Sequence, residues 1–565
     1  MRGQRHSGAI VNEPRFGILI AALVVAFAIS VVARVRSTRT AVDFQLAGQR
    51  MGVITNAFAI CGDYVSAASF LGVAAAVYAA GVDGAWYATG FAAGFIPVLL
   101  FVATPLRRFG DRSIPDFLAR RFNSEKVRIV SVVMVQLVIL AYLVPQAVGG
   151  GLAWELFSDL ALPGLTPYST GIVASTLLTS SLVVIGGMRG TTWNQAIQFL
   201  VLLGILMWVA VALYADGFDY SDSVAAASAE PLRSVVESST GEVSTESTVN
   251  QIGGGAARFS APGARYSRSG QFALLATLMF GTAGLPHVMN RFFTSSTGRA
   301  ARKTTVWVIG LIGLFYALAV MVGTAARFVI ARDVAEHEWL ADISVEGVLR
   351  TPEHALLALG RLYGGEMGLS IVTTGALLAI MSTIGGLLLA ASASWGHDVY
   401  EQHLNPRASR TQALRAGQLV VAVIALAAAL IAMAVDSNRI PASVPSVVAS
   451  LVTTAFALAG CALTPSIVLA IWWKKVTPTA IIVGMVFGST SAIACISYSL
   501  WVSASDLLQA PTIFLAPMVF VVIAVVSAFT EPAPDVDQIW VRMHGSANDR
   551  KAERLARITL ETTRR

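Results

Sequence analysis

Long apolar segments separated by short polar connectors account for most of this chain. Each segment has about 20 residues, the length that an α-helix needs to cross a bilayer. The pattern predicts an all-α integral membrane protein with about thirteen transmembrane helices. Their expected ranges are 16–33, 56–78, 86–105, 129–152, 169–185, 193–213, 272–288, 306–329, 368–394, 418–435, 447–473, 480–500 and 513–529.

The second segment, NAFAICGDYVSAASFLGVAAAVY, carries Asp63 near its middle. An ionisable group at membrane depth is costly, so it is expected to face protein, water or an ion. Gly62 precedes it, and Gly and Asp both favour an interruption of a helix. Irregular backbone is tolerated in a membrane only where it is buried or lines a cavity. We therefore predict a broken helix of the kind that holds ions and substrates at a transporter's midplane.

The polar connectors differ in length and character. Residues 216–270 are rich in Ser, Gly and Ala and show no helical period, which predicts a long and partly disordered loop. IPDFLARRF, after the third segment, has the pattern of a short amphipathic helix at the membrane interface. The charged tail 531–565 is too short for a catalytic domain.

The composition agrees with a multi-pass membrane protein. The 565 residues are 55% hydrophobic and 13% charged, whereas about 25% of the residues in a soluble protein are charged. The net charge of +7 comes from basic residues in short connectors, which positive charge in the cytoplasm explains better than nucleic acid does. Cys61, Cys461 and Cys495 lie in apolar segments without metal-ligand spacing, and we interpret them as buried hydrophobic residues.

Basic and acidic residues alternate between successive connectors, and this sets the expected orientation. The connectors with basic clusters are expected in the cytoplasm. An odd number of helices then places the N-terminus outside and the C-terminus inside a protein of the cell membrane. The basic set is Arg34, Arg36, Arg39, Arg50, Arg107, Arg108, Arg120, Arg121, Arg291, Arg299, Arg302, Lys303, Arg407, Arg410, Arg415, Lys474 and Lys475. The opposite set holds Asp83, Asp159, the acidic connector 333–353 and Asp436.

Several motifs, in order along residues 43–473, resemble the sodium/solute symporter family. They are DFQLAG, GDYVSAASFLG, GGMRGTTWNQ, FGTAGLPHVMNRFFT and the hydroxyl-rich LLAIMSTIGGLLLAASAS. GDYVSAASFLG and GTAGLPHVMNRFFT are most similar to its cation–acetate symporter (acetate permease) branch. The resemblance implies a five-plus-five inverted-repeat (LeuT-like) transporter core. The second to sixth segments form one repeat and the seventh to eleventh the other, with the second and seventh as broken partners.

The resemblance also implies a domain organisation. Residues 1–51 hold the N-terminal span and a cytoplasmic connector, and 52–473 hold the core. Within the core, 52–213 is the first repeat, 214–270 an extracellular loop and 271–473 the second repeat. Residues 474–530 add two C-terminal spans, and 531–565 form a cytoplasmic tail.

A sodium site between the second and ninth segments is a further implication of the resemblance. Backbone carbonyls of the broken helix and two adjacent hydroxyls supply its oxygens, which suits a hard cation. The matching positions are the carbonyls of Gly62, Val65 and Ala379 and the side chains of Ser382 and Thr383. The alternative is that the two hydroxyls bond the carbonyl one turn back or help helices to pack.

The substrate site is expected beside the same break. A small carboxylate can be held by half-helix N–H groups and hydroxyls, and no Arg or Lys lies in the middle of these segments. The candidates are Tyr64, Ser66, Ser69, Tyr142, Gln146, Thr282 and Gly284. For Tyr142 and Gln146 an interhelical hydrogen bond is an equally good explanation.

Asp63 admits three interpretations of equal weight. The carboxyl attracts the cation, carries a coupling proton, or accepts hydrogen bonds from the free N–H groups of the unwound turn. It is therefore a pore-lining or coupling candidate. His287 and Arg291, near the cytoplasmic end of the seventh segment, are expected to form a gate or an interface anchor.

These features predict a symporter that couples inward cation movement, with Na⁺ as the expected ion, to uptake of a small monocarboxylate such as acetate, propionate or pyruvate. The alternatives are Na⁺ symport of a neutral solute such as proline or a sugar, and H⁺-coupled monocarboxylate uptake. No HExxH, no GxSxG with triad partners and no Walker loop indicates an enzyme. The expected partners are a small organic anion, the coupling cation and the bilayer, without nucleic acid or any other cofactor. The sequence leaves the oligomeric state open.

Overall fold

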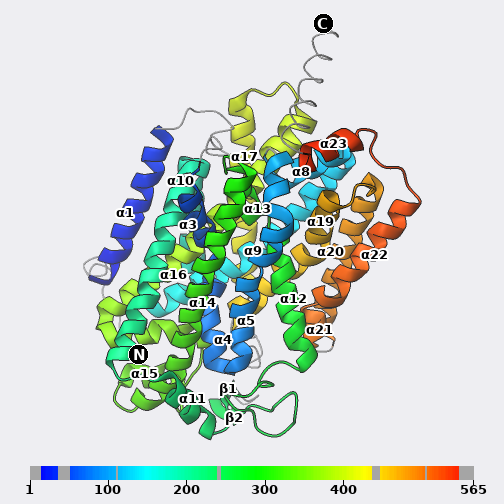
Figure 1. Ribbon diagram of the computed structural model, residues 1–565. Coiled ribbons are helices and arrows are strands. Elements are labelled where there is room, and N and C mark those ends of the chain that lie inside the picture. The colour runs from blue at the N-terminus through cyan, green and yellow to red at the C-terminus, as the bar shows by residue number, and fades with distance from the viewer. Residues whose placement is uncertain are drawn as a thin grey trace.

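The computed structural model describes residues 14–35, 51–109, 112–237, 243–435, 446–502 and 505–545. Here the chain is a bundle of long helices that run side by side, with α1 at one edge and α22 at the other (Figure 1). Several sequence predictions fall on residues outside these ranges: DFQLAG, Arg36, Arg39, Arg50, Asp436 and the tail beyond Gly545.

The secondary structure is almost entirely helical, with three π-helical stretches inside longer helices and a fourth after α16. The helices up to the long polar connector are α1 (Pro14–Val35), α3 (Val53–Tyr64), η3 (Ala68–Gly72), α4 (Val73–Ala80), α5 (Val82–Ala93), α6 (Phe95–Pro97), η4 (Val98–Val102), α7 (Ala103–Phe109), α8 (Ile114–Phe122), α9 (Glu125–Phe157) and α10 (Pro167–Ala215). The connector itself contains α11 (Tyr220–Ala229), β1 (Arg233–Glu237) and β2 (Val243–Ser247).

The remaining elements follow the connector. They are α12 (Arg268–Gly284), α13 (Pro286–Phe293), α14 (Gly298–Asp333), α15 (Glu338–Asp342), β3 (Ser344–Val345), β4 (Val348–Leu349), η5 (Pro352–His354), α16 (Ala355–Ala393), η6 (Ser394–Leu404), α17 (Arg410–Ala434), α18 (Val447–Leu458), η8 (Ala459–Leu463), α19 (Thr464–Trp472), α20 (Pro478–Trp501), α21 (Asp506–Gln509), α22 (Thr512–Ala528) and α23 (Val536–His544).

The membrane-spanning helices agree with the predicted segments. Within the described chain, 9 helices are long and apolar enough to span a bilayer, or up to 11 if each bent pair counts as one span. α10 contains a sharp bend at Gly187, where φ is 55°, so its two arms correspond to the fifth and sixth segments. α22 is a shorter apolar helix of 17 residues. When the second arm of α10 and the helix α22 are added to these 11, each of the thirteen predicted segments corresponds to a helix.

The second and seventh spans are broken, as predicted. α3 and the η3–α4 half meet at an angle of 72°, and α12 and α13 meet at 41°. The first break is extended at Val65 (φ −72°, ψ 95°) and the second at Leu285 (φ −69°, ψ 118°). Leu285 precedes Pro286, and a residue before proline disfavours the helical conformation. The two breaks are five spans apart, which fits a five-plus-five repeat.

The ends of the bundle support an inverted arrangement. α8 follows the third span and lies at one end of the bundle, whereas α15 follows the eighth span and lies at the other (Figure 1). Equivalent connectors at opposite ends are what an inverted repeat requires. The amphipathic helix predicted from IPDFLARRF is α8, and its first turn is capped by the Ser113 hydroxyl, which accepts from Asp116 N.

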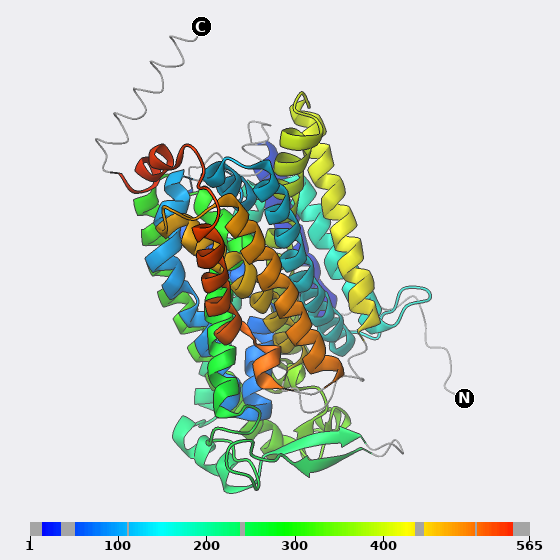
Figure 2. The same cartoon turned by 90° about the vertical axis from the view of Figure 1, so that its right-hand side faces the viewer.

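The prediction of a long loop over 216–270 was wrong for much of its length. This connector forms α11 and an antiparallel β1–β2 hairpin at the end of the bundle opposite α23 (Figure 2). The buried Asp83 carboxylate fixes its end by accepting hydrogen bonds from the backbone of Gly263, Arg265 and Tyr266 and from the Gln271 side chain. A small apolar cluster, which includes Leu232 and Phe259, then packs against Val77 and Ala80.

Candidate functional site

The hydroxyls of Ser382 and Thr383, on α16, donate hydrogen bonds to backbone carbonyls of α3 and not to carbonyls of their own helix. The Ser382 hydroxyl donates to the carbonyl oxygen of Gly62 at 2.5 Å, and Thr383 donates to that of Asp63 at 2.9 Å. These carbonyls belong to the last turn of α3, where the helix leaves its carbonyls without intrahelical partners. The structure therefore brings together Gly62, Ser382 and Thr383, three of the five predicted cation-site residues.

The other two predicted cation-site residues lie beside this contact. Val65 caps α3 in an extended conformation, with its N–H bonded to Cys61 O at 2.8 Å. Ala379 is fully buried in α16, one turn before the hydroxyl pair. Val65 thus lies at the end of α3, and Ala379 lies on α16 one turn before the two hydroxyls that contact that end.

Asp63 is held in a buried network of side chains. Arg291 Nε donates to its Oδ2 at 3.1 Å, and Gln195 Nε2 donates to its Oδ1 at 3.0 Å. Gln195 Nε2 also donates to Ser382 O at 2.8 Å, and Arg291 bonds both Gln195 Oε1 and the Thr192 hydroxyl. Of the three interpretations, the observed contacts match a structural acceptor. Its donors are side chains, however, and not the free N–H groups of the unwound turn.

Arg291 and His287 lie in α13, the last part of the seventh span, as expected, but neither is exposed as an interface anchor would be. α13 continues the seventh span to Phe293, so Arg291 is 1% exposed and reaches the carboxylate of Asp63. An arginine therefore does reach the centre of these segments. His287 is also 1% exposed, and its ring lies 5.3 Å from that of Tyr142, centroid to centroid, next to the break in the seventh span.

A cluster of uncharged polar groups lies on the other side of the break in the second span. Gln146 Oε1 accepts from Ala67 N, the first N–H beyond the break, at 3.0 Å. Gln146 Nε2 and both ring nitrogens of His287 are buried and have no hydrogen-bond partner among the described residues. The Ser66 hydroxyl is near enough to interact with Tyr142, but it makes no well-formed hydrogen bond with a described residue. We call Ser66, Tyr142, Gln146 and His287 the break cluster.

The remaining predicted substrate residues are occupied by protein contacts. The Tyr64 hydroxyl bonds both the Phe91 carbonyl and the Thr282 hydroxyl at 2.9 Å. The Ser69 hydroxyl bonds that of Tyr316 at 2.7 Å. Gly284 lies so close to Ala459 O and the Thr464 hydroxyl that an added Cβ would collide with them. These four residues join helices instead of presenting free polar atoms at the break.

Sequence reasoning missed Gln195 and Phe456. In the sequence, Gln195 is one of several polar residues at the start of the sixth segment, and nothing there distinguishes it from the others. In the structure it is completely buried. Phe456 carried no signal, yet its ring packs against both Tyr64 and Tyr142, at 6.2 and 5.7 Å between centroids. Phe456 of α18 therefore packs against aromatic residues of both α3 and α9.

Among the described residues, one group has the geometry to hold a metal ion: Asp116, His397 and Asp398 at the end of the bundle near α8. The guanidinium of Arg128 already lies between the two carboxylates, at 3.3 Å from Asp116 and 3.0 Å from Asp398. Burial alone would raise the pKa of Asp116, but the nearby His397, 3.7 Å from it, and the charges of Arg120 and Arg128 lower that pKa to about 2. The positive charge of Arg128 thus compensates the two carboxylates. The ion pairs of Asp116, Arg128 and Asp398 hold α8, α9 and η6 together.

Two broken spans related by a five-helix repeat, with buried polar groups at the breaks, define a secondary transporter of the LeuT-like inverted-repeat class. The chain belongs to the sodium:solute symporter family, whose model matches residues 44–488. Na⁺ is accordingly its coupling ion and a solute its cargo, and the protein is a multi-pass membrane transporter.

Two individual proteins illustrate the similarity. The chain is 30% identical over 513 residues to a monocarboxylic acid transporter of Corynebacterium glutamicum, covering 89% of this chain and 87% of that protein. Its fold resembles a Na⁺-coupled sialic acid symporter in a substrate-bound, outward-open state. That match has a TM-score of 0.68 and 16% identity, and covers 92% of this chain and 98% of the symporter.

Proposed function

We propose that this protein couples the inward movement of Na⁺ to uptake of a small monocarboxylate, with acetate, propionate and pyruvate as candidates. The observation that carries the proposal is the break cluster, whose buried polar atoms lack partners beside a half-helix that begins at the break. Buried polar groups in proteins are almost always hydrogen-bonded, so unmet ones together favour a ligand.

The break cluster suits a carboxylate that arrives without a cationic partner. The positive end of the half-helix dipole lies at Ala67 and Ala68 and attracts an anion. Gln146 Nε2, the Ser66 hydroxyl and an N–H of His287 are further donors for the two carboxylate oxygens. The rings of Tyr142 and Phe456, 5.7 Å apart between centroids, supply an apolar surface against which a short carbon chain can pack.

The sodium site of this proposal consists of the Gly62, Val65 and Ala379 carbonyls and the Ser382 and Thr383 hydroxyls. The hydroxyls now donate to the carbonyls of Gly62 and Asp63. A cation here would be bound by carbonyl and hydroxyl oxygens together, in place of those hydrogen bonds. Because Gly62 is four residues from Ser66, cation binding and the shape of the substrate site depend on the same helix end.

Two observations favour this proposal over its alternatives. The relative named above is a monocarboxylic acid transporter, which favours an acid over proline or a sugar. Asp63 is ion-paired with Arg291, so the break offers no free carboxyl among the described residues to carry a coupling proton. Asp63 is therefore part of the support for the site and not a ligand.

The test is uptake of labelled acetate, pyruvate and proline into proteoliposomes with the Na⁺ and H⁺ gradients imposed separately. Acetate or pyruvate uptake that follows the Na⁺ gradient alone is the expected result. Uptake that needs only a proton gradient, or that selects proline over both acids, would overturn the proposal.

A further inference from the structure

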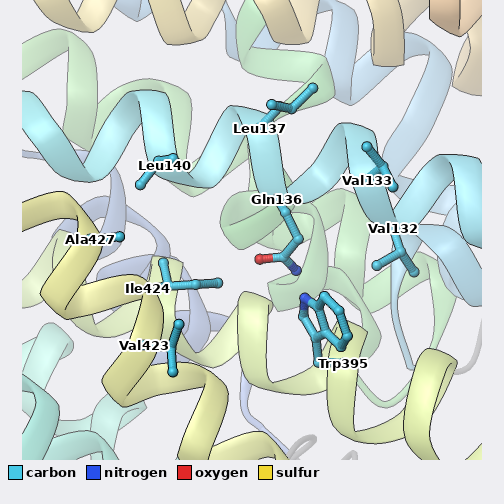
Figure 3. A pocket seen from close by; sticks show the side chains of 9 residues that line it. All are labelled: Val132, Val133, Gln136, Leu137, Leu140, Trp395, Val423, Ile424 and Ala427. Carbon is cyan, nitrogen blue, oxygen red and sulfur yellow. The ribbon is translucent and has the colours of Figure 1, made fainter. Parts of the chain in front are cut away.

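A cavity lies on the membrane-facing side of the bundle, between α9, η6 and α17 (Figure 3). Its volume is about 320 Å³, at the lower end of the range for small-molecule sites. Val133 and Val423 at its rim are 48% and 58% exposed, so it opens toward the lipid. The lining consists of Val132, Val133, Gln136, Leu137, Leu140, Trp395, Val423, Ile424 and Ala427.

Gln136 is the one amide in this otherwise apolar lining. Its Oε1 and Nε2 atoms are both buried, and neither has a hydrogen-bond partner in the described parts of the chain. The indole of Trp395 turns its nitrogen toward this amide across the cavity (Figure 3). An unmet buried donor or acceptor costs about 1–3 kcal/mol. The cavity therefore favours an occupant with one donor, one acceptor and an apolar body.

The depth of Gln136 restricts what can enter. It lies 11 residues beyond Glu125, the first residue of α9, which is roughly 16 Å along the helix. At that depth the surrounding medium is lipid hydrocarbon, so an ionised group is strongly disfavoured. The break cluster is separate, because Tyr142 and Gln146 lie further along α9 and are buried in the bundle.

We propose that this cavity binds the protonated carboxyl group of a single-chain fatty acid from the bilayer. The acid O–H donates to Gln136 Oε1, and the acid carbonyl accepts from Gln136 Nε2. A carboxylic acid and a carboxamide match in this way in one plane, so both unmet atoms are satisfied by one head group. The acyl chain lies against the apolar residues of α9 and α17 and leaves through the opening to the lipid.

The experiment is photolabelling of the purified full-length chain in nanodiscs with a diazirine-bearing long-chain fatty acid. The matched probe is the methyl ester of the same acid, which keeps the chain and the carbonyl but loses the O–H donor. With the parent protein we expect the acid to label α9 and α17 about fivefold more than the ester does. Equal labelling by acid and ester would overturn the proposal without any variant.

Three variants locate the site. Gln136→Leu should reduce labelling by the acid to the level of the ester. Val423→Trp should fill the cavity and abolish labelling by both probes, and Leu419→Trp, one turn away on the exposed face of α17, should leave it unchanged. Full acid labelling in Gln136→Leu, or equal labelling by a diazirine phosphatidylcholine, would show instead that ordinary lipid chains fill the cavity.

Discussion

The two sides of the break in the second span differ in how fully their polar groups are satisfied. Before the break, the carbonyls of Gly62 and Asp63 and the Asp63 carboxylate all have partners from α10, α13 or α16. After the break, Gln146 and His287 have unmet polar atoms. The first side is a closed network that holds helices together, and the second retains capacity for a ligand.

This difference separates groups that fix the structure from groups that bind cargo. Gly62 and Gly386 make the closed side dense: an added Cβ at Gly62 would collide with the backbone of Gln195, and one at Gly386 with the Asp63 carboxylate. At the break cluster Gly149 is also tightly packed, against Ala67, but Gln146 Nε2 and both ring nitrogens of His287 have no partner among the described residues. Substitutions on the two sides should therefore have different effects, on stability and cation affinity in one case and on substrate affinity in the other.

The largest expected effect is on stability, from Arg291→Met. Removing one partner of a buried ion pair leaves an uncompensated charge and costs about 3–5 kcal/mol. We expect a large fall in the thermal unfolding temperature of the purified protein in detergent. Asp63→Asn combined with Arg291→Met should recover part of it, because the stranded charge is gone.

The matched control for that change is Arg302→Met. Arg302 lies exposed near the start of α14, so its loss should leave the unfolding temperature almost unchanged. If Arg291→Met unfolds at the same temperature as Arg302→Met, the Asp63–Arg291 pair does not stabilise the closed side.

The next effect is on cation affinity. Ser382→Ala or Thr383→Ala removes a proposed oxygen ligand at a cost of about 1–3 kcal/mol. This predicts a roughly tenfold to hundredfold rise in the Na⁺ concentration for half-maximal uptake, at 1.4 kcal/mol per decade. Apparent substrate affinity should recover partly at high Na⁺, because coupling between two ligands is reciprocal.

Ser370→Ala is the control for the hydroxyl substitutions. The Ser370 hydroxyl lies on the same helix but donates to Glu366 O, one turn back. Uptake by Ser382→Ala and Thr383→Ala that matches Ser370→Ala at every Na⁺ concentration would remove these residues from the sodium site.

A smaller effect, on substrate affinity, is expected at the break cluster. Ser66→Ala and Gln146→Leu each remove a proposed donor to the carboxylate, and about 1 kcal/mol corresponds to a roughly fivefold rise in the KM for acetate. Ser69→Ala is the control, because its hydroxyl bonds Tyr316 instead. Uptake kinetics at saturating Na⁺ measure this, and an unchanged KM in both variants would contradict the assignment of the break cluster.

The last prediction concerns orientation and should leave transport unchanged. A cysteine at Ser244 in β2 should react with a membrane-impermeant reagent on intact cells, and one at the exposed Asp537 should react only after lysis. The opposite pattern would show that the protein is inserted in the membrane the other way round, with β2 on the cytoplasmic side.

Much of the fold could be predicted from local sequence. The length of each apolar segment predicts a membrane span, because a helix forms all its backbone hydrogen bonds within itself. Gly62 and Asp63 within an apolar run, and Pro286 after Leu285, mark the two breaks because those residue types disfavour a continued helix. The connector 216–270 could not be predicted in the same way. Its order depends on Asp83, 180 residues from Gly263 in the chain.

The sequence by itself determined the transporter class, the positions of the breaks and the candidate residues around them. Only the tertiary structure decided which of these residues meet. Arg291 pairs with Asp63 across 228 positions, and Gln195 joins them from a third helix. Hydrophobic pattern and helix propensity act within a few turns, whereas these contacts arise from how closely separate helices pack. The same packing satisfies Ser69 and leaves Gln146 with a free donor, and nothing in either residue's neighbouring sequence distinguishes the two.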